Sequence, residues 1–166
     1  MLGARRKNRG GALVEFALVV PLLILLVLGT IDFGIVLLNL NSARQGTREG
    51  ARQGVVGYFG SSTSCNINGS GIADPTQRLM CLTKSRIGLD SASTRVRVYF
   101  PDTNAVGKSL IVCSQYPMKS TSGALAPVIN GHTVKTKVEM RIEKADSTLL
   151  AGSENPLTGE DWLWCA

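Results

Sequence analysis

The feature that most constrains this chain is an uncharged apolar run close to its N-terminus. Residues 16–31 read FALVVPLLILLVLGTI, and the only charged residues between positions 12 and 40 are Glu15 and Asp32. A helix of this length spans about 24 Å, somewhat less than the ~30 Å hydrocarbon core of a bilayer. A spanning helix must therefore hold Glu15, Asp32 or both near an interface, or continue past Asp32 through residues 33–38.

Three ordinary explanations exist for such a run. A cleaved secretory signal peptide fits poorly, because the run is too long and no small-x-small cleavage site follows it. A buried core helix also fits poorly, because Leu, Val and Ile occupy every face of the helix. A single-pass membrane anchor fits both the length and the composition.

The positive charge of the chain is concentrated before this run. Arg5, Arg6, Lys7 and Arg9 precede the first acidic residue, Glu15. Removing these four from the 18 basic residues leaves 14 against 12 acidic ones, so the rest of the chain is nearly balanced. Basic residues beside an apolar helix mark its cytoplasmic end. We therefore expect a cytoplasmic N-terminus and an extracytoplasmic remainder, and no nucleic-acid binding.

The order of residues at the start of the run distinguishes it from an ordinary anchor. The basic cluster leads into Gly10 and Gly11, Glu15 and Phe16 follow, and Pro21 lies inside the apolar stretch. A carboxylate just inside an apolar helix is costly and normally has a partner. An ordinary anchor has no reason to place one there.

The run RGGALVEFALVVPLLILLVLGTIDFGIVLLNLNSARQGTREGAR resembles the N-terminal domain of the TadE-like family, which is similar to type IV pilins. The resemblance covers about residues 9–54 and rests on the glycine junction, the Glu-Phe pair and the apolar helix in combination. It implies a structural protein, a minor pseudopilin of a tight-adherence pilus or secretion system, with no enzymatic activity and no cofactor.

The resemblance also implies a maturation step. A prepilin peptidase would cut between Gly10 and Gly11, which makes Glu15 the fifth mature residue; a cut after Gly11 would make it the fourth. Glu15, next to Phe16, could then pair with the new α-ammonium group of a neighbouring subunit and set the register between subunits. Pro21 would kink or loosen the helix, since it removes a backbone donor.

The implied surroundings are those of a pilus assembly system. Expected partners are the prepilin peptidase, other pilins or pseudopilins, an inner-membrane platform protein and an assembly ATPase. The expected location is the bacterial cytoplasmic membrane, with the pilus or cell surface as a further possibility. The alternative is an unprocessed, single-pass, membrane-anchored extracytoplasmic binding domain, in which the Glu-Phe pair is accidental.

Beyond the apolar run, two kinds of residue recur every four positions, which places each kind on one face of a helix. The arginines are Arg44, Arg48 and Arg52, and the glycines, offset by two, are Gly46, Gly50 and Gly54. A glycine inside a helix costs up to about 1 kcal/mol relative to alanine. The glycine face therefore predicts close approach of another backbone, from the chain's own domain or from another helix.

Four cysteines follow the apolar run: Cys65, Cys81, Cys113 and Cys165. None forms a Cys-x-x-Cys pair and His132 is the only histidine, so no metal site is expected. The spacing predicts two disulfides in an oxidising compartment, with three possible connectivities. Cys65–Cys81 with Cys113–Cys165 is favoured, because the first closes a short loop and the second ties down the C-terminus.

The remaining sequence predicts a small α+β domain. Residues 57–75 are rich in Gly, Ser and Asn and indicate a loop, and residues 75–85 a short helix capped by Asp74. Alternating apolar residues predict strands at 94–100 and 133–142, with 110–115 as a third candidate, in an antiparallel sheet with one face free to pack on the helix. Trp162 and Trp164 should pack around the disulfide of Cys165.

The expected organisation is therefore pilin-like. Residues 1–10 are a basic leader peptide, residues 11–57 a transmembrane and stalk helix, and residues 58–166 a disulfide-bonded extracytoplasmic domain with a small antiparallel sheet.

Overall fold

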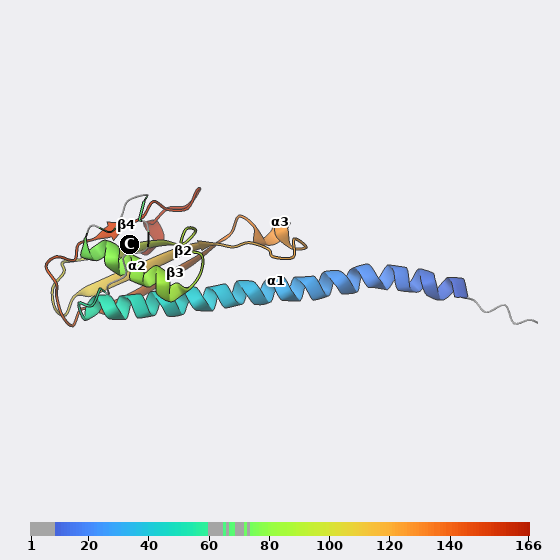
Figure 1. Ribbon diagram of the computed structural model, residues 1–166, viewed down its shortest axis with the longest axis horizontal. Coiled ribbons are helices and arrows are strands. Elements are labelled where there is room, and N and C mark those ends of the chain that lie inside the picture. Colours follow the sequence, from blue (N-terminus) through green and yellow to red (C-terminus); the bar gives the residue numbers. More distant parts are fainter. Residues whose placement is uncertain (1–8, 60–64, 66, 69–71, 73) are drawn as a thin grey trace, which may run out of the picture.

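The computed structural model describes residues 9–59, 65, 67, 68, 72 and 74–166. The elements in chain order are α1 (Arg9–Val55), α2 (Pro75–Ile87), β1 (Arg95–Tyr99), β2 (Ser109–Pro117), α3 (Ala126–Ile129), β3 (Thr133–Arg141), β4 (Gly152–Ser153) and the 3-10 turn η1 (Leu163–Cys165). Figure 1 shows one long helix, α1, with the other elements gathered over its C-terminal half. The expected α+β class is confirmed, while most of the leader and part of the loop at 57–75 lie outside the described residues.

Helix α1 is continuous over its 47 residues and passes through Pro21 without ending. Its axis changes direction within the blue N-terminal part that contains Pro21 (Figure 1). The helix ends two residues before Gly57, which adopts the left-handed conformation (φ 70°). The amides of Gly57 and Tyr58 donate to the carbonyls of Gly54 and Gln53. This pair of bonds is a Schellman motif, and glycine adopts its left-handed residue without a steric penalty.

Helix α2 begins as its sequence predicts. The Asp74 side chain accepts a hydrogen bond from the Gln77 amide at 2.8 Å, and Pro75 occupies the first turn, where its missing N–H costs nothing. Gly88, in the left-handed conformation, closes the C-terminus. The helix is two residues longer than expected.

The sheet has the order β3-β2-β1-β4 and is antiparallel throughout. Three of its strands are the predicted ones, and β2 is longer than its predicted core. The fourth strand, β4, was not expected, because two residues, Gly152 and Ser153, are too few to produce an alternating pattern.

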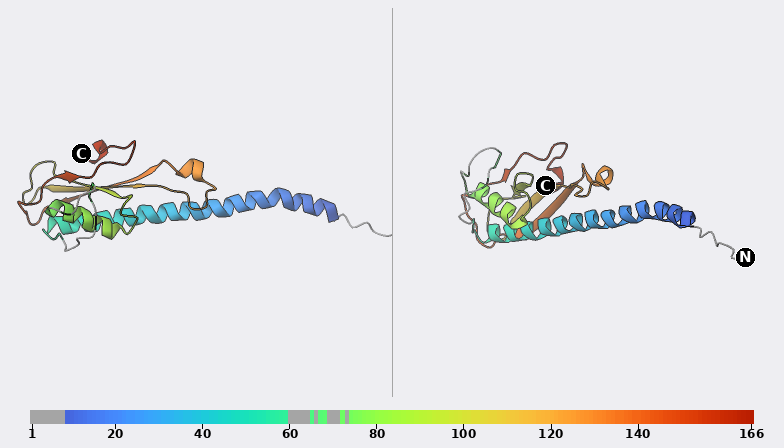
Figure 2. Two further views of the ribbon diagram at one scale, coloured as in Figure 1. Left: turned by 45° about the horizontal axis from the view of Figure 1, so that its top comes forward. Right: turned by 45° about the vertical axis from the view of Figure 1, so that its right-hand side comes forward.

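The two faces of the sheet are covered by different parts of the chain. One face carries Val96, Val98, Leu110 and Val112, which form the main core with α1 and α2. The other face carries Ile111 and Cys113, which lie under a C-terminal segment with Trp162 and Cys165. The left view of Figure 2 shows these three layers: helices, sheet and C-terminal segment. The central strand β2 is therefore buried on both faces.

The C-terminal half of α1 packs on the domain through its glycine face. A Cβ added to Gly46 would overlap the backbone of Arg86 and Ile87, and one added to Gly50 would overlap Thr83. A Cβ on Gly54 would lie 2.8 Å from Leu110 Cδ2. The neighbours on the same face are small and buried: Ala43, Thr47 and Ala51 are at most 1% exposed. The approaching backbone thus belongs to the chain's own domain.

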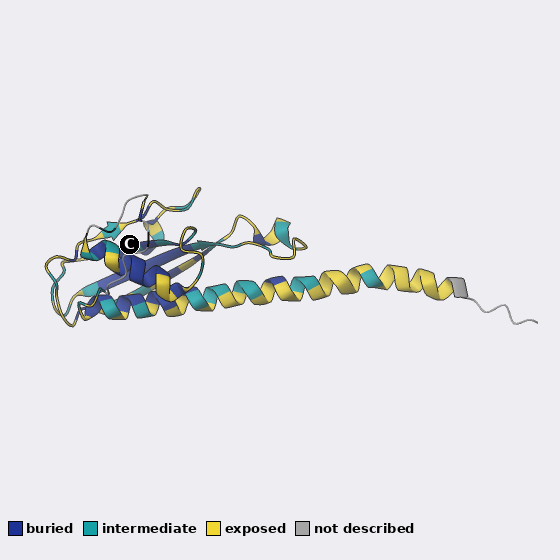
Figure 3. Ribbon diagram, in the orientation of Figure 1, coloured by how far each residue is buried: buried dark blue, intermediate teal, exposed yellow. Residues whose placement is uncertain are grey.

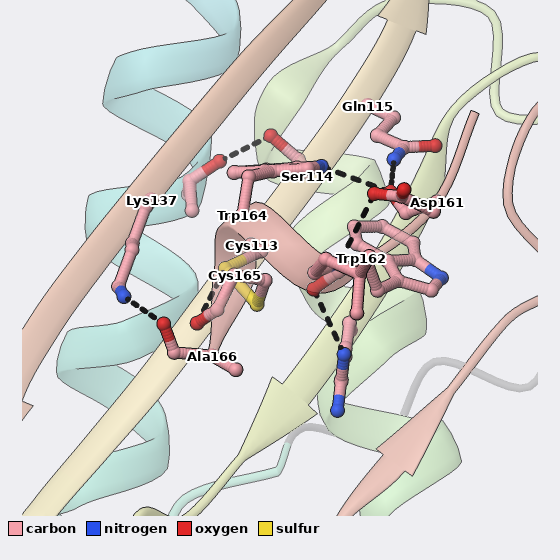
Figure 4. The surroundings of a disulfide bond; sticks show 12 residues. Cys113, Ser114, Gln115, Lys137, Asp161, Trp162, Trp164, Cys165 and Ala166 are labelled. Carbon is pink, nitrogen blue, oxygen red and sulfur yellow. Dashed lines mark hydrogen bonds between the residues drawn. A yellow bond between two sulfur atoms is a disulfide. The ribbon is translucent and has the colours of Figure 1, made fainter.

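Two disulfides fix the domain. Cys65 is joined to Cys81 on α2, and Cys113 on β2 is joined to Cys165 in η1. This is the connectivity that loop length favoured. Trp162 and Trp164 lie beside the second disulfide, with ring centroids 5.8 Å apart (Figure 4). Since Lys137 also donates to the carbonyl of Ala166, the end of the chain is held against β3.

A buried ion pair joins three elements of the domain. The ammonium of Lys84 on α2 lies 2.6 Å from Glu154 Oε1, and both side chains are 2% exposed. The other carboxylate oxygen, Oε2, accepts a hydrogen bond from the Val96 amide at 2.8 Å, and the Glu154 carbonyl accepts one from the Trp162 indole. Each charge is compensated, which removes the large penalty of an isolated buried charge.

Candidate functional site

The candidate site from the sequence lies at the free end of α1. The helix begins at Arg9, so the Gly10–Gly11 junction lies within its first turn. Glu15 is exposed and Phe16 is 67% exposed. Within the described part of the chain, Glu15 has no hydrogen bond or ion pair. A Cβ on Gly11 would meet nothing within 4 Å. The backbone and side chains of this end are therefore open to a partner from outside the chain.

The surface that follows is apolar and uncovered. Figure 3 shows the N-terminal half of α1 as almost entirely exposed. Leu18, Leu22 and Leu26 are 65–74% exposed, and the other exposed large apolar residues between Leu13 and Leu38 range from 46% to 69%. The helix is long and apolar enough to cross a membrane, and none of its most apolar window is buried. Such a surface in water opposes solubility, since each exposed apolar Å² costs about 25 cal/mol.

Asp32 lies within this apolar stretch of the sequence, but its carboxylate is not part of the exposed surface. It is 1% exposed, because residues 120–122 enclose its carboxylate. The hydroxyls of Ser120 and Ser122 donate to Oδ2 at 2.6 and 2.7 Å, and the amides of Thr121 and Ser122 donate to Oδ1 at 3.0 and 2.9 Å. We call this arrangement the Asp32 clamp. Four hydrogen bonds compensate the charge without a cation.

The sequence allowed Asp32 to lie near a membrane interface but identified no partner for its carboxylate, and the structure supplies that partner from residues 120–122. The partner segment lies 88 to 90 positions away in the chain. A local signal existed in the run Ser120-Thr121-Ser122-Gly123, because hydroxyl residues before a glycine are typical of anion-binding turns. Nothing in the sequence connected that turn with Asp32.

The arginine stripe lies on the side of α1 that faces away from the domain. Arg44, Arg48 and Arg52 are all exposed, whereas the glycines between them face α2 and β2. The structure thus brings the predicted glycines onto the domain and leaves Glu15, Phe16 and the arginines free of it. The two ends of α1 have separate surroundings.

Comparison with known proteins agrees with the N-terminal features. Residues 10–52 match the family model described as TadE-like protein. No curated protein and no solved structure matches the chain. The matched range begins at the glycine junction, contains Glu15, Phe16, Pro21 and Asp32, and ends in the glycine face. The resemblance seen in the sequence is therefore confirmed, and residues 10–52 form a TadE-like segment.

Proposed function

We propose that this chain is a TadE-like minor pseudopilin that acts in the assembly of a tight-adherence type IV pilus or secretion apparatus. The observation that carries this proposal is the TadE-like match over residues 10–52, which coincides with the exposed residues Gly11 and Glu15 and an uncovered apolar helix. The role is structural, and no enzymatic activity is part of it.

The proposed maturation is a cut by a prepilin peptidase between Gly10 and Gly11. The cut removes the basic cluster, which otherwise holds the helix in the membrane, and creates an α-ammonium group. Glu15 is exposed and lacks a partner among the described residues, so its carboxylate is available to the ammonium of a neighbouring subunit. Pairing would neutralise two charges that are costly in lipid.

The proposed location is the bacterial cytoplasmic membrane, crossed once, with the domain outside the cytoplasm. An oxidising compartment is supported by the two disulfides, and the orientation by the basic residues before Gly10. Partners would be the prepilin peptidase, other pilins or pseudopilins, a platform protein in the membrane and an assembly ATPase on its cytoplasmic side.

The first test is the intact mass and N-terminal sequence of the chain, expressed in membranes with and without a prepilin peptidase. We expect loss of residues 1–10 only when the peptidase is present. An intact N-terminus under both conditions would contradict the proposal and favour an unprocessed anchor with a binding domain.

The second test separates assembly from processing. Glu15→Gln keeps the size of the side chain and removes its charge, so processing should continue while piliation falls strongly. Glu49→Gln is the matched control, because Glu49 also lies on α1, where it is partly exposed, but beyond the apolar run. Normal piliation in the Glu15 variant would rule out its role in subunit registration.

A further inference from the structure

The connection between β2 and β3, residues 118–132, reaches back along α1 toward its apolar half. Figure 1 shows its helix α3 well beyond the end of the sheet, above the middle of α1. It contacts α1 at two levels. The Asp32 clamp is the first, and the second is Leu125, whose Cδ1 lies 3.5 Å from a Cβ placed on Gly29. The connection thus extends about one helical turn beyond Asp32, toward the N-terminus of α1.

This connection is unusual in composition for an exposed segment. Residues 120–134 contain no Asp, Glu, Lys or Arg, in a chain that is 18% charged. Pro127 and Val128 are exposed, Val128 to 66%. A loop in water normally carries polar residues, because its surface is solvated. The lack of charge suits a region where water gives way to hydrocarbon.

Two apolar grooves adjoin the connection, and Phe33 of α1 lines both. One has a volume of about 590 Å³ and is lined by Leu25, Leu26, Phe33 and Leu125, among others. The other has a volume of about 360 Å³ and includes Phe33, Val128 and Ile129. Both open onto the apolar surface of α1, which continues without a break through Leu22 and Leu26.

The depth of these grooves follows from the length of α1. Seventeen residues separate Glu15 from Asp32, a rise of about 26 Å, and the hydrocarbon core is about 30 Å thick. With Glu15 at one interface, Asp32 lies about 4 Å inside the other, and Gly29, beside Leu125, about 9 Å inside it. This step rests on the membrane anchoring in the proposed function.

We propose that residues 118–132 anchor the domain in the outer leaflet of the membrane, with lipid acyl chains in the two grooves and in contact with Leu125 and Val128. The Asp32 clamp holds the connection at this depth and compensates the charge that would otherwise limit how far α1 enters the membrane. Acyl chains are the occupant, because the grooves continue the apolar surface of α1 at the depth that lipid occupies.

The test uses the full-length chain in phosphatidylcholine vesicles, with an environment-sensitive fluorophore on single introduced cysteines. The four native cysteines are paired, so the introduced thiol is the reactive one. Val128→Cys probes the connection, and Val106→Cys is its matched control, since both valines are 66% exposed. Val106 precedes β2 and Val128 follows it, so they lie beyond opposite ends of that strand. Leu26→Cys reports insertion of α1.

We expect blue-shifted emission and several-fold stronger quenching by spin-labelled lipid at positions 26 and 128 than at position 106. Quenching at position 26, with emission at position 128 like that at position 106, would overturn the contact of residues 118–132 with lipid. It would leave the membrane anchoring of α1 intact. No quenching at 26 would contradict the anchor itself. A blue shift at 128 without lipid quenching would show that a protein, such as a second copy, fills the grooves, and would overturn the lipid assignment.

Discussion

The two halves of α1 share one backbone conformation and have opposite surroundings. In the N-terminal half the large apolar side chains are exposed, Leu18 to 74%, and in the C-terminal half the buried side chains are small, Ala51 to 0%. Large apolar residues supply stabilisation only when something covers them, whereas small ones allow a neighbouring backbone to approach. The first half therefore needs a partner outside the chain, and the second has its partner within it.

The boundary between the halves lies at the Asp32 clamp. N-terminal to Asp32, Leu125 of the connection lies against α1 at Gly29. On the C-terminal side, α1 joins the common core through Ala51 and Val55. A single carboxylate on α1 thus lies between the largely exposed half of the helix and the half that joins the core.

The largest expected effect is unfolding of the domain while the exposed half of α1 keeps its structure. Replacing Cys113 and Cys165 by alanine removes a cross-link between residues 52 positions apart, which we expect to cost about 4 kcal/mol. The domain should then unfold in milder denaturant while the exposed half of α1 stays helical in micelles. Fluorescence reports the domain, because Trp162 and Trp164 both lie in it, and far-ultraviolet circular dichroism reports the helix. Loss of both signals together would show that the halves are one cooperative unit.

A glycine substitution sharpens the comparison, because its sign should differ between an open position on α1 and the glycine face that packs on the domain. Gly46→Ala should destabilise the domain by roughly 2–3 kcal/mol, since the added methyl overlaps the backbone of α2. Gly34→Ala meets nothing within 4 Å and should be neutral or stabilising by up to about 1 kcal/mol. Denaturant unfolding in micelles measures both. Equal effects would mean that the glycine face is not a close packing surface.

A substitution of Asp32 should weaken the contact between α1 and residues 120–122 at the boundary between the two halves. Asp32→Ala leaves two hydroxyls and two amides without their acceptor, and local opening of residues 120–122 should become easier by about 2 kcal/mol, roughly 30-fold. Hydrogen exchange at the Thr121 and Ser122 amides measures this. Asp32→Asn is the control, because its amide oxygen still accepts both backbone bonds and should retain much of the protection. Unchanged exchange in the alanine variant would contradict the clamp.

The smallest expected effect concerns the ion pair between β3 and the C-terminal segment. Lys135, 2.5 Å away, is the main reason that the pKa of Glu160 lies below its usual value of 4.5. A lowered folded-state pKa means that this stabilisation is present above about pH 4.5 and is lost as the pH falls through the folded value.

Glu160→Gln should therefore reduce stability at neutral pH by less than about 1 kcal/mol, because Lys135 is partly solvated, and should have no effect in strong acid. Unfolding followed by tryptophan fluorescence at pH 7 and at pH 2 measures the difference. Glu139→Gln, which removes the same charge from an exposed position on β3, is the control. A cost that is equal at both pH values would exclude the ion pair as its cause.

Much of the architecture could be predicted from local patterns. The apolar run predicted an exposed helix, the alternation in residues 133–142 predicted β3, and Asp74 with Pro75 predicted the start of α2. These signals are reliable because period, capping and loop length act between residues that are close in sequence. The short strand β4 gave no such signal, because its position depends on pairing with Arg97 and Val98.

By itself the sequence determined that α1 is a continuous helix with an apolar half and a glycine face, and that the cysteines form disulfides. Only the tertiary structure decided that the glycine face packs on α2 and β2, and that Ser120 and Ser122 enclose Asp32. The physical reason is separation along the chain. A single turn of helix is encoded by neighbouring residues, whereas a contact across nearly ninety positions exists only because β2 and its loop carry those residues back along α1.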